Sequence, residues 1–198
     1  MAQMIAGPPP ALPESLDVPR KQWTRSECRQ LMELGILEEA RFELIHGEII
    51  LKMTQHERHV FTCKQVQQAL EAIFGTEYVR MAAPIAISER EEPEPDAAVM
   101  TRTGRDYLQS GTPPPGDVRL AVEVSDRTLR FDRTVKRGQY AAAGIPEYWI
   151  VDINARALQV LRRPVAGDYT DETTLTVGDT LAPLAAPEAS VAVADLLP

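Results

Sequence analysis

Residues 118–152 constrain the fold most, because they read as a strand, a helix and a second strand in close succession. Residues 118–125 alternate in period two, and their β-branched composition favours a central strand covered on both faces. A helix is expected from about Phe131, with Gly144 as its C-terminal cap and Pro146 preventing its continuation. Residues 147–152 form another short apolar run. The succession predicts a crossover between two parallel strands.

Two charged side chains occupy positions in this unit where a charge is costly. Glu123 lies inside the first strand, and an ionised carboxylate there needs a cation, a metal or solvent to compensate for burial. Lys136 lies in the helix, where its four-residue spacing from Asp132 and Tyr140 places all three on one face. Together, Glu123 and Lys136 suggest a site.

The remaining composition fits one domain with a leader. Of the 198 residues 44% are hydrophobic, which is enough to fill a core without disulfides or metals. Residues 1–20 contain five of the sixteen prolines and are interpreted as a flexible leader. Residues 21–198 are interpreted as the single domain.

Cysteine content and hydropathy suggest where the protein works. Cys28 and Cys63 are the only cysteines and form no CxxC motif, which suits a reducing compartment. The N-terminus lacks the features of a signal peptide, and no apolar run is long enough to span a membrane. The expected location is the cytoplasm, without membrane association.

The formal net charge of −8 argues against tight nonspecific binding to nucleic acid, which depends on neutralising phosphates. It does not exclude a nuclease, because a local basic patch or a metal can still meet the phosphates. Part of the acidity can belong to such a site.

Local patterns predict the other elements. Thr24 and Glu27 form a capping-box pattern before a helix that Gly35 ends, and residues 41–53 read as a hairpin turning at His46 and Gly47. The longest helical pattern runs from residue 57 to 74. Strands or strand-like runs are expected at 78–79, 85–87, 95–100, 157–162, 169–170 and 173–177, with an irregular loop at 101–117 and a short strand or turn at 190–197.

Three residues could form a catalytic constellation. Asp96 opens the strand after Pro95, and Glu123 lies in or near the end of a strand that could pair with it. Two converging carboxylates, with the backbone carbonyl of Val124, suit Mg²⁺, for which Mn²⁺ can substitute. Such a metal polarises a phosphate and activates water, and Lys136 could orient that water or stabilise the transition state.

The chain resembles the Uma-two family of proposed endonucleases, which belongs to the PD-(D/E)XK restriction-endonuclease-like superfamily. The resemblance extends from Trp23 to the C-terminus. Its motifs are FELIHGEII (42–50), MTQHERH (53–59), EPEPDAAV (92–99), VEVSDRTLRFDRTVK (122–136) and AGIPEYWIVD (143–152).

The resemblance implies an α/β (α+β) fold with an αβββαβ core, in which helices flank a mixed central sheet and an N-terminal helix and β-hairpin are added. It also implies a metal-dependent phosphodiesterase site. Asp96 matches the aspartate of the PD motif and Glu123 the acid of the second motif. Ser125 stands where the superfamily places its lysine, and Lys136 corresponds to a lysine that has moved to the following helix.

The resemblance adds supporting candidates. Glu43 and Glu48 match the acidic positions of the family's hairpin, and His59 matches a histidine that begins its first core helix. His46 departs from the aspartate that is usual at its position. The implied partner is nucleic acid, with DNA favoured.

Structural roles remain open for the three main candidates. Asp96 could cap a turn, and Glu123 could pair with Arg119 or Arg133. Lys136 could be an ordinary solvated helix lysine.

The supporting candidates have similar alternatives. Glu43 and Glu48 could lie on a solvent-exposed face of the hairpin, and His59 could be a hydrogen-bonded structural histidine.

Three functional hypotheses follow. The first is a Mg²⁺-dependent nuclease using Asp96, Glu123 and Lys136. The second is a catalytically inactive nucleic-acid- or protein-binding module that keeps the fold. The third, a transition-metal hydrolase using all three histidines, ranks last because the spacing matches no metal motif. DNA versus RNA and sequence preference stay open, and a two-fold homodimer is only the base-rate expectation.

Overall fold

The structure is a computed structural model that describes residues 19–37, 42–52 and 54–198. Most of the predicted leader, residues 1–18, lies outside the described residues, as do residues 41 and 53 at the ends of the predicted hairpin. Arg20, which is described, is exposed to solvent.

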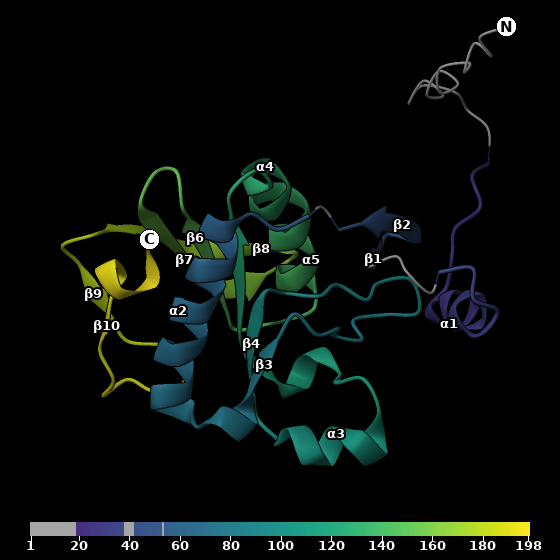
Figure 1. Cartoon of the computed structure of the whole chain (residues 1–198), viewed down its shortest axis with the longest axis horizontal. Helices are drawn as coiled ribbons and strands as arrows, with labels where there is room; N and C mark the ends of the chain where they lie inside the picture. The colour runs from purple at the N-terminus through teal and green to yellow at the C-terminus, as the bar shows by residue number, and fades with distance from the viewer. Residues whose placement is uncertain (1–18, 38–41, 53) are drawn as a thin grey trace, which may run out of the picture.

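A six-stranded mixed sheet forms the centre of the fold, in the order β3-β4-β5-β6-β7-β8 (Figure 1). Its strands are β3 (Val79–Met81), β4 (Ala97–Met100), β5 (Val118–Ser125), β6 (Glu147–Asp152), β7 (Ala157–Val165) and β8 (Asp168–Thr176). β5 pairs with β6 in parallel, and the other neighbouring strands are antiparallel. The predicted parallel crossover is therefore confirmed.

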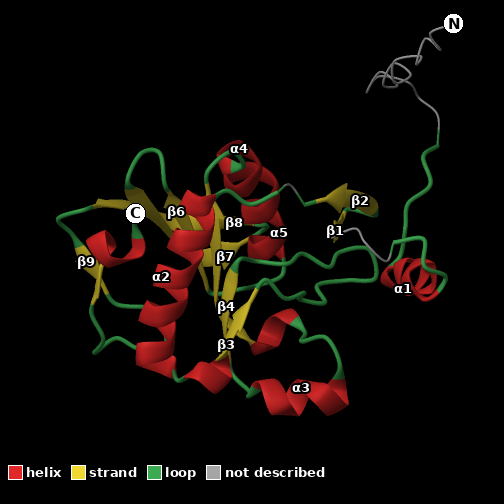
Figure 2. Ribbon diagram, viewed as in Figure 1, coloured by secondary structure: helices red, strands yellow, loops and turns green. Residues whose placement is uncertain are grey.

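Helices cover both faces of this sheet (Figure 2). The helical segments are α1 (Arg25–Glu33), α2 (Glu57–Phe74), η1 (Thr76–Tyr78), α3 (Gly104–Ser110), η2 (Pro115–Asp117), α4 (Leu129–Phe131), η3 (Asp132–Lys136), α5 (Arg137–Ala142) and η4 (Val193–Leu196). On one face Val66 and Leu70 of α2 pack into a core with Trp149. On the other face Tyr140 of α5 packs with Tyr148.

The order α2-β3-β4-β5-α5-β6 is the expected αβββαβ core, and β7 and β8 extend the sheet beyond it. The mixed α/β fold class is therefore confirmed. Among the described residues, no helix has the length and apolar character needed to cross a lipid bilayer.

The N-terminal helix and hairpin form as their patterns predict. Thr24 and Glu27 make the reciprocal capping box at the start of α1. The hairpin consists of β1 (Phe42–Ile45) and β2 (Glu48–Leu51), and it turns through His46 and Gly47 at φ 50° and 77°. A side chain at Gly47 would also put its Cβ 2.9 Å from the Cβ of Gln22, so glycine is needed there for space and conformation. The tail packs back as expected, with β10 (Val191–Ala192) against β9 (Thr180–Leu181).

Two regions differ from the expectation. Residues 85–87 form no strand, because Pro84 lacks an N–H and Ile85 bonds to Pro93 in an irregular arrangement. The loop predicted for 101–117 contains α3, which starts with a capping box between Thr103 and Asp106. The glycines and prolines of this stretch concealed that local signal.

The C-terminal strands also differ from the expectation. The strand expected at 157–162 continues to Val165, and the runs expected at 169–170 and 173–177 belong to one strand, β8. Pairing along almost its whole length with the neighbouring strand β7 holds the polar residues of the edge strand β8 extended.

Candidate active site

β4 and β5 place two carboxylates opposite each other. Ala97 pairs with Val122 in the antiparallel register, so Asp96 and Glu123 are cross-strand neighbours on the same face of the sheet. Asp96 is fixed further by its Oδ2, which accepts a 2.8 Å hydrogen bond from the backbone N–H of Val124. Both residues are almost completely buried, at 9% and 6% exposure.

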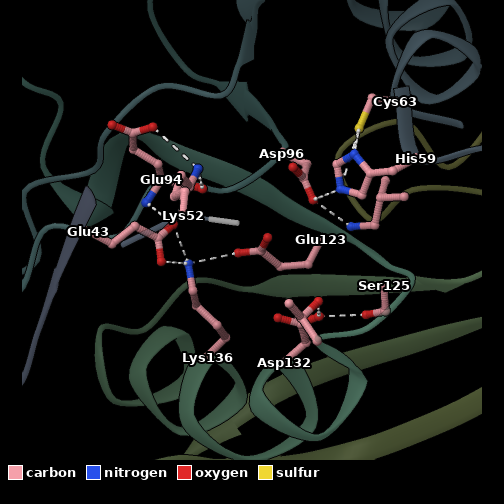
Figure 3. Close-up of polar contacts among 12 residues, drawn as sticks. Glu43, Lys52, His59, Cys63, Glu94, Asp96, Glu123, Ser125, Asp132 and Lys136 are labelled. Carbon is pink, nitrogen blue, oxygen red and sulfur yellow. Dashed lines mark hydrogen bonds and ion pairs between the residues drawn. The ribbon is translucent and has the colours of Figure 1, made fainter. Parts of the chain in front are cut away.

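Lys136 reaches Glu123 from the helix that follows β5 (Figure 3). Its Nζ lies 3.1 Å from Glu123 Oε1 and 2.7 Å from Glu43 Oε2, and the residue is 2% exposed. Lys136 is therefore a buried ion-pair partner and not a solvated surface lysine.

One wide helical turn helps to place Lys136. Residues Asp132–Lys136 form a π-helical turn, in which the N–H of Arg137 donates to the carbonyl of Asp132, five residues earlier. The Tyr148 hydroxyl also donates to that carbonyl. Both Asp132 and Lys136, four residues apart, lie on the buried side of the helix. Single π turns occur often at functional sites.

The N-terminal hairpin supplies the third carboxylate. Glu43 is buried in β1 and accepts hydrogen bonds from Lys136 and from the backbone N–H of Glu94. Lys52, just after β2, lies 3.4 Å from Glu43 and 3.3 Å from Glu94, and it donates to the carbonyl of Glu94. These contacts join the separate two-stranded hairpin to the main sheet.

Asp132 is the fourth buried carboxylate. Its Oδ2 accepts 2.6 Å hydrogen bonds from the hydroxyls of Ser125 and Thr128. Ser125 thus helps to orient Asp132, the acid that the helix supplies to the site.

Burial and neighbouring charges shift the pKa values of the acids of the site. Burial raises the pKa of Glu123 to about 8, although the Lys136 ammonium acts in the opposite direction. Burial also raises the pKa of Asp132, against its two hydroxyl donors. Burial would raise the pKa of Asp96 too, but the hydrogen bond and charge of His59 hold it below its usual value.

The pKa of Lys136 is shifted in the direction that favours its charged form. Burial alone would lower the pKa of Lys136, but the carboxylates of Glu123 and Glu43 raise it above its usual value. Lys136 therefore carries its proton at neutral pH and acts as a cation. Four buried acids face two lysine ammoniums and His59, so full ionisation of the acids would favour a further cation.

His59 extends the site toward α2. Its Nε2 lies 3.4 Å from Asp96 Oδ2, and its Nδ1 lies 3.4 Å from the sulfur of Cys63, one helical turn away. Burial opposes protonation of His59, but the hydrogen bond and charge of Asp96 raise its pKa overall.

These groups line one pocket of about 420 Å³. Asp96, Glu123, Lys136, Glu43 and His59 all contribute to its wall, as does Val124. Apolar wall comes from Ile50, Leu51 and Phe131.

Two of the residues considered in the sequence analysis, Glu48 and His46, lie outside the lining of this pocket. Glu48 is exposed and 4.0 Å from Arg20, and His46 pairs with Glu91 at 2.9 Å. His46 is also outside the lining of the pocket that contains His56 and His59, so the structure does not gather the three histidines. Arg133, one of the two arginines considered as an ion-pair partner of Glu123, contacts Gln159 and Asp152 instead.

Sequence reasoning missed Lys52 and Cys63 as members of this site. Lys52 could have been found from strand alternation, because Glu43 pairs with Ile50 and residues 50 and 52 share a face. Cys63 follows His59 at i, i+4, which places both on one side of a helix.

The arrangement can hold a hard cation and stabilise negative charge. Tyr140 and Lys136 both approach Oε1 of Glu123, and Val124 and His59 both approach Oδ2 of Asp96. Asp96 and Glu123 are thus the carboxylates that this pocket offers to a metal. An oxygen donor set suits Mg²⁺.

A comparison with solved structures supports the fold. The chain resembles a solved structure from Anabaena variabilis ATCC 29413, described as "a putative nuclease belonging to DUF820". The match has a TM-score of 0.62 and 17% identity, and it covers 87% of this chain and 96% of the other. The chain therefore shares the mixed α/β fold of that structure.

The family match is extensive. The chain belongs to the Uma2 family, described as "Putative restriction endonuclease", which it matches over residues 27–194. Comparison with curated proteins gives no match. The resemblance expected from the sequence motifs is therefore confirmed at the level of the family.

Proposed function

We propose that this protein is a Mg²⁺-dependent nuclease of the PD-(D/E)XK type, which hydrolyses phosphodiester bonds in DNA. The observation that carries the proposal is the meeting of Asp96, Glu123 and Lys136 in one pocket. Family membership supports the choice of nucleic acid as substrate.

The oxygen donors of this pocket suit Mg²⁺. Asp96 and Glu123 would hold Mg²⁺ with the carbonyl of Val124, and Mn²⁺ would substitute for it. Bound Mg²⁺ supplies a Lewis acid for the phosphate and lowers the pKa of a coordinated water.

The protein's own groups have separate tasks. The Lys136 ammonium stabilises the charge that develops on the phosphate during hydrolysis. Glu43 holds Lys136 from the side opposite Glu123, and Lys52 holds Glu43 in turn. Glu43 is therefore a positioning residue in this proposal.

Metal binding and cleavage test the proposal together. Mn²⁺ titration by calorimetry should show binding to wild type that Asp96→Asn loses. Nicking of supercoiled DNA should require Mg²⁺ or Mn²⁺, and Asp96→Asn and Lys136→Met should each reduce its rate by about 100-fold or more.

The hairpin offers a matched pair of variants. Glu43→Gln alters the buried acid, whereas Glu48→Gln alters an exposed acid of the same hairpin. Activity should fall in the first and stay within about threefold of wild type in the second, a margin well below the loss of one transition-state contact. Full activity in folded Asp96→Asn would refute the assignment. Wild type with neither metal binding nor cleavage would favour the binding-module alternative.

A further inference from the structure

His59, Cys63 and Asp96 form a second set of donors at the edge of the acidic pocket (Figure 3). One donor atom from each lies within 4.8 Å of the other two. His59 Nε2 is 3.4 Å from Asp96 Oδ2 and 4.0 Å from Cys63 Sγ. α2 fixes the first two residues one turn apart, and the loop before β4 brings the third.

The spacing is close to that of a tetrahedral zinc site. Zinc bonds of about 2.0–2.3 Å at tetrahedral angles put neighbouring ligand atoms roughly 3.3–3.6 Å apart. The two distances from His59 Nε2 are near those values, and all three donor atoms lie within 4.8 Å of one another, so side-chain movements on the order of 1 Å would bring the set to zinc-ligand spacing.

The donor chemistry separates this set from the oxygen site. One nitrogen, one sulfur and one oxygen suit Zn²⁺, whereas Mg²⁺ prefers oxygen ligands alone. Three protein ligands would leave a fourth position for water, reached through the pocket wall that His59 and Asp96 share.

Cys63 is poorly placed to act as a catalytic nucleophile. It is absent from the residues that line the pocket, so a substrate there does not meet its sulfur. Burial and the nearby Asp96 charge raise the pKa of its thiol, which argues against a free thiolate nucleophile. A bound metal would displace the thiol proton, as zinc does with coordinating thiols.

We propose that His59, Cys63 and Asp96 bind Zn²⁺, and that Zn²⁺ and Mg²⁺ compete because both sites use Asp96. Zn²⁺ would then inhibit the chain's Mg²⁺-dependent cleavage. The inhibition rests on the proposed function, but Zn²⁺ binding does not.

Co²⁺ is the direct probe, because its absorption reports both a thiolate ligand and tetrahedral geometry. Titration of the full chain with Co²⁺ should produce a thiolate-to-cobalt charge-transfer band and intense visible bands. Addition of Zn²⁺ should abolish both. Magnesium at millimolar concentration should weaken Co²⁺ binding.

Two cysteine variants make the matched comparison. Cys63→Ser should lose the charge-transfer band and at least about tenfold in Zn²⁺ affinity, since a ligand should matter no less than the outer-shell partners of a metal. Cys28→Ser, at a buried cysteine on α1, should keep the charge-transfer band and the Zn²⁺ affinity of wild type. Cys63→Ala provides a second variant if serine at this position disturbs folding, and circular dichroism checks both proteins.

The outcomes separate this proposal from the nuclease proposal. No charge-transfer band in wild type, or a band that survives in Cys63→Ser and Cys63→Ala, would overturn the zinc site. A band in wild type without Mn²⁺ binding or cleavage would uphold the zinc site and count against the nuclease. Cleavage that Zn²⁺ does not inhibit would overturn the competition.

Discussion

Replacing Lys136 by methionine should destabilise the fold as well as the site. Methionine keeps much of the length of the side chain but leaves Glu43 and Glu123 without the ammonium that lies 2.7 Å and 3.1 Å from them. Removing one partner of a buried ion pair costs about 3–5 kcal/mol, because the remaining charge stays desolvated.

The structure points to the lower end of that range. Two hydrogen bonds to charged groups, at about 1.5 kcal/mol each, account for about 3 kcal/mol. Lys52, 3.4 Å from Glu43, offsets part of the remaining charge. For a chain of this size, about 3 kcal/mol corresponds to a fall in Tm of roughly 6–12 °C.

Urea denaturation at pH 8, followed by circular dichroism, would measure the loss. Lys64→Met is the control, since Lys64 is an exposed lysine on α2 and its replacement should cost less than about 0.5 kcal/mol. Adding Glu43→Gln to Lys136→Met should restore at least about 1 kcal/mol, because it removes an unpaired charge.

The reasoning fails if Lys136→Met lies within about 1 kcal/mol of wild type, the size of an ordinary substitution. It also fails if the double variant is less stable than Lys136→Met alone. Either result would mean that the ammonium does not compensate for the buried acids.

Two further predictions concern neighbours of Glu123 and Asp96. Tyr140→Phe removes the hydroxyl that donates to Glu123 at 2.7 Å, so it should cost about 1–3 kcal/mol in urea denaturation; unchanged stability would contradict the hydrogen bond's role. The His59–Asp96 pair should add pH dependence, because Asp96 raises the pKa of His59 in the folded state. Its stabilisation is full below the unfolded pKa of about 6.5 and is lost as pH rises through the higher folded pKa. Urea midpoints from pH 5 to 9 should therefore decline more steeply in wild type than in His59→Gln, in which the raised pKa of Glu123 still contributes a decline, and parallel profiles would count against the pair.

The sequence predicted the parts of the fold that local patterns specify. Period-two alternation defined β5, and Gly144 and Pro146 marked the end of the helix before β6. Once β4 and β5 were assigned as neighbours, strand pairing alone placed Asp96 near Glu123. The capping box at Thr103 was equally local, and the prolines around it caused it to be overlooked.

Long-range placement was harder to predict. Nothing in β1 and β2 specifies where a hairpin of four-residue strands docks, so the contact between Glu43 and Lys136, 93 residues apart, needed the structure. The role of Lys52 depends on the same docking. The family motifs pointed to Glu43 and Glu48 alike, and only their burial separates them.

The π turn at Asp132–Lys136 fixes the angular phase between the two ends of its helix. Each residue of an α-helix advances by about 100°, so one residue more or less in this turn would rotate everything beyond it by about that angle. Such a rotation would turn Tyr140 away from Glu123 or Lys136 away from Glu43. The length of this segment is therefore constrained as tightly as the identity of its side chains, and insertions or deletions here should be tolerated far less than in an ordinary surface helix.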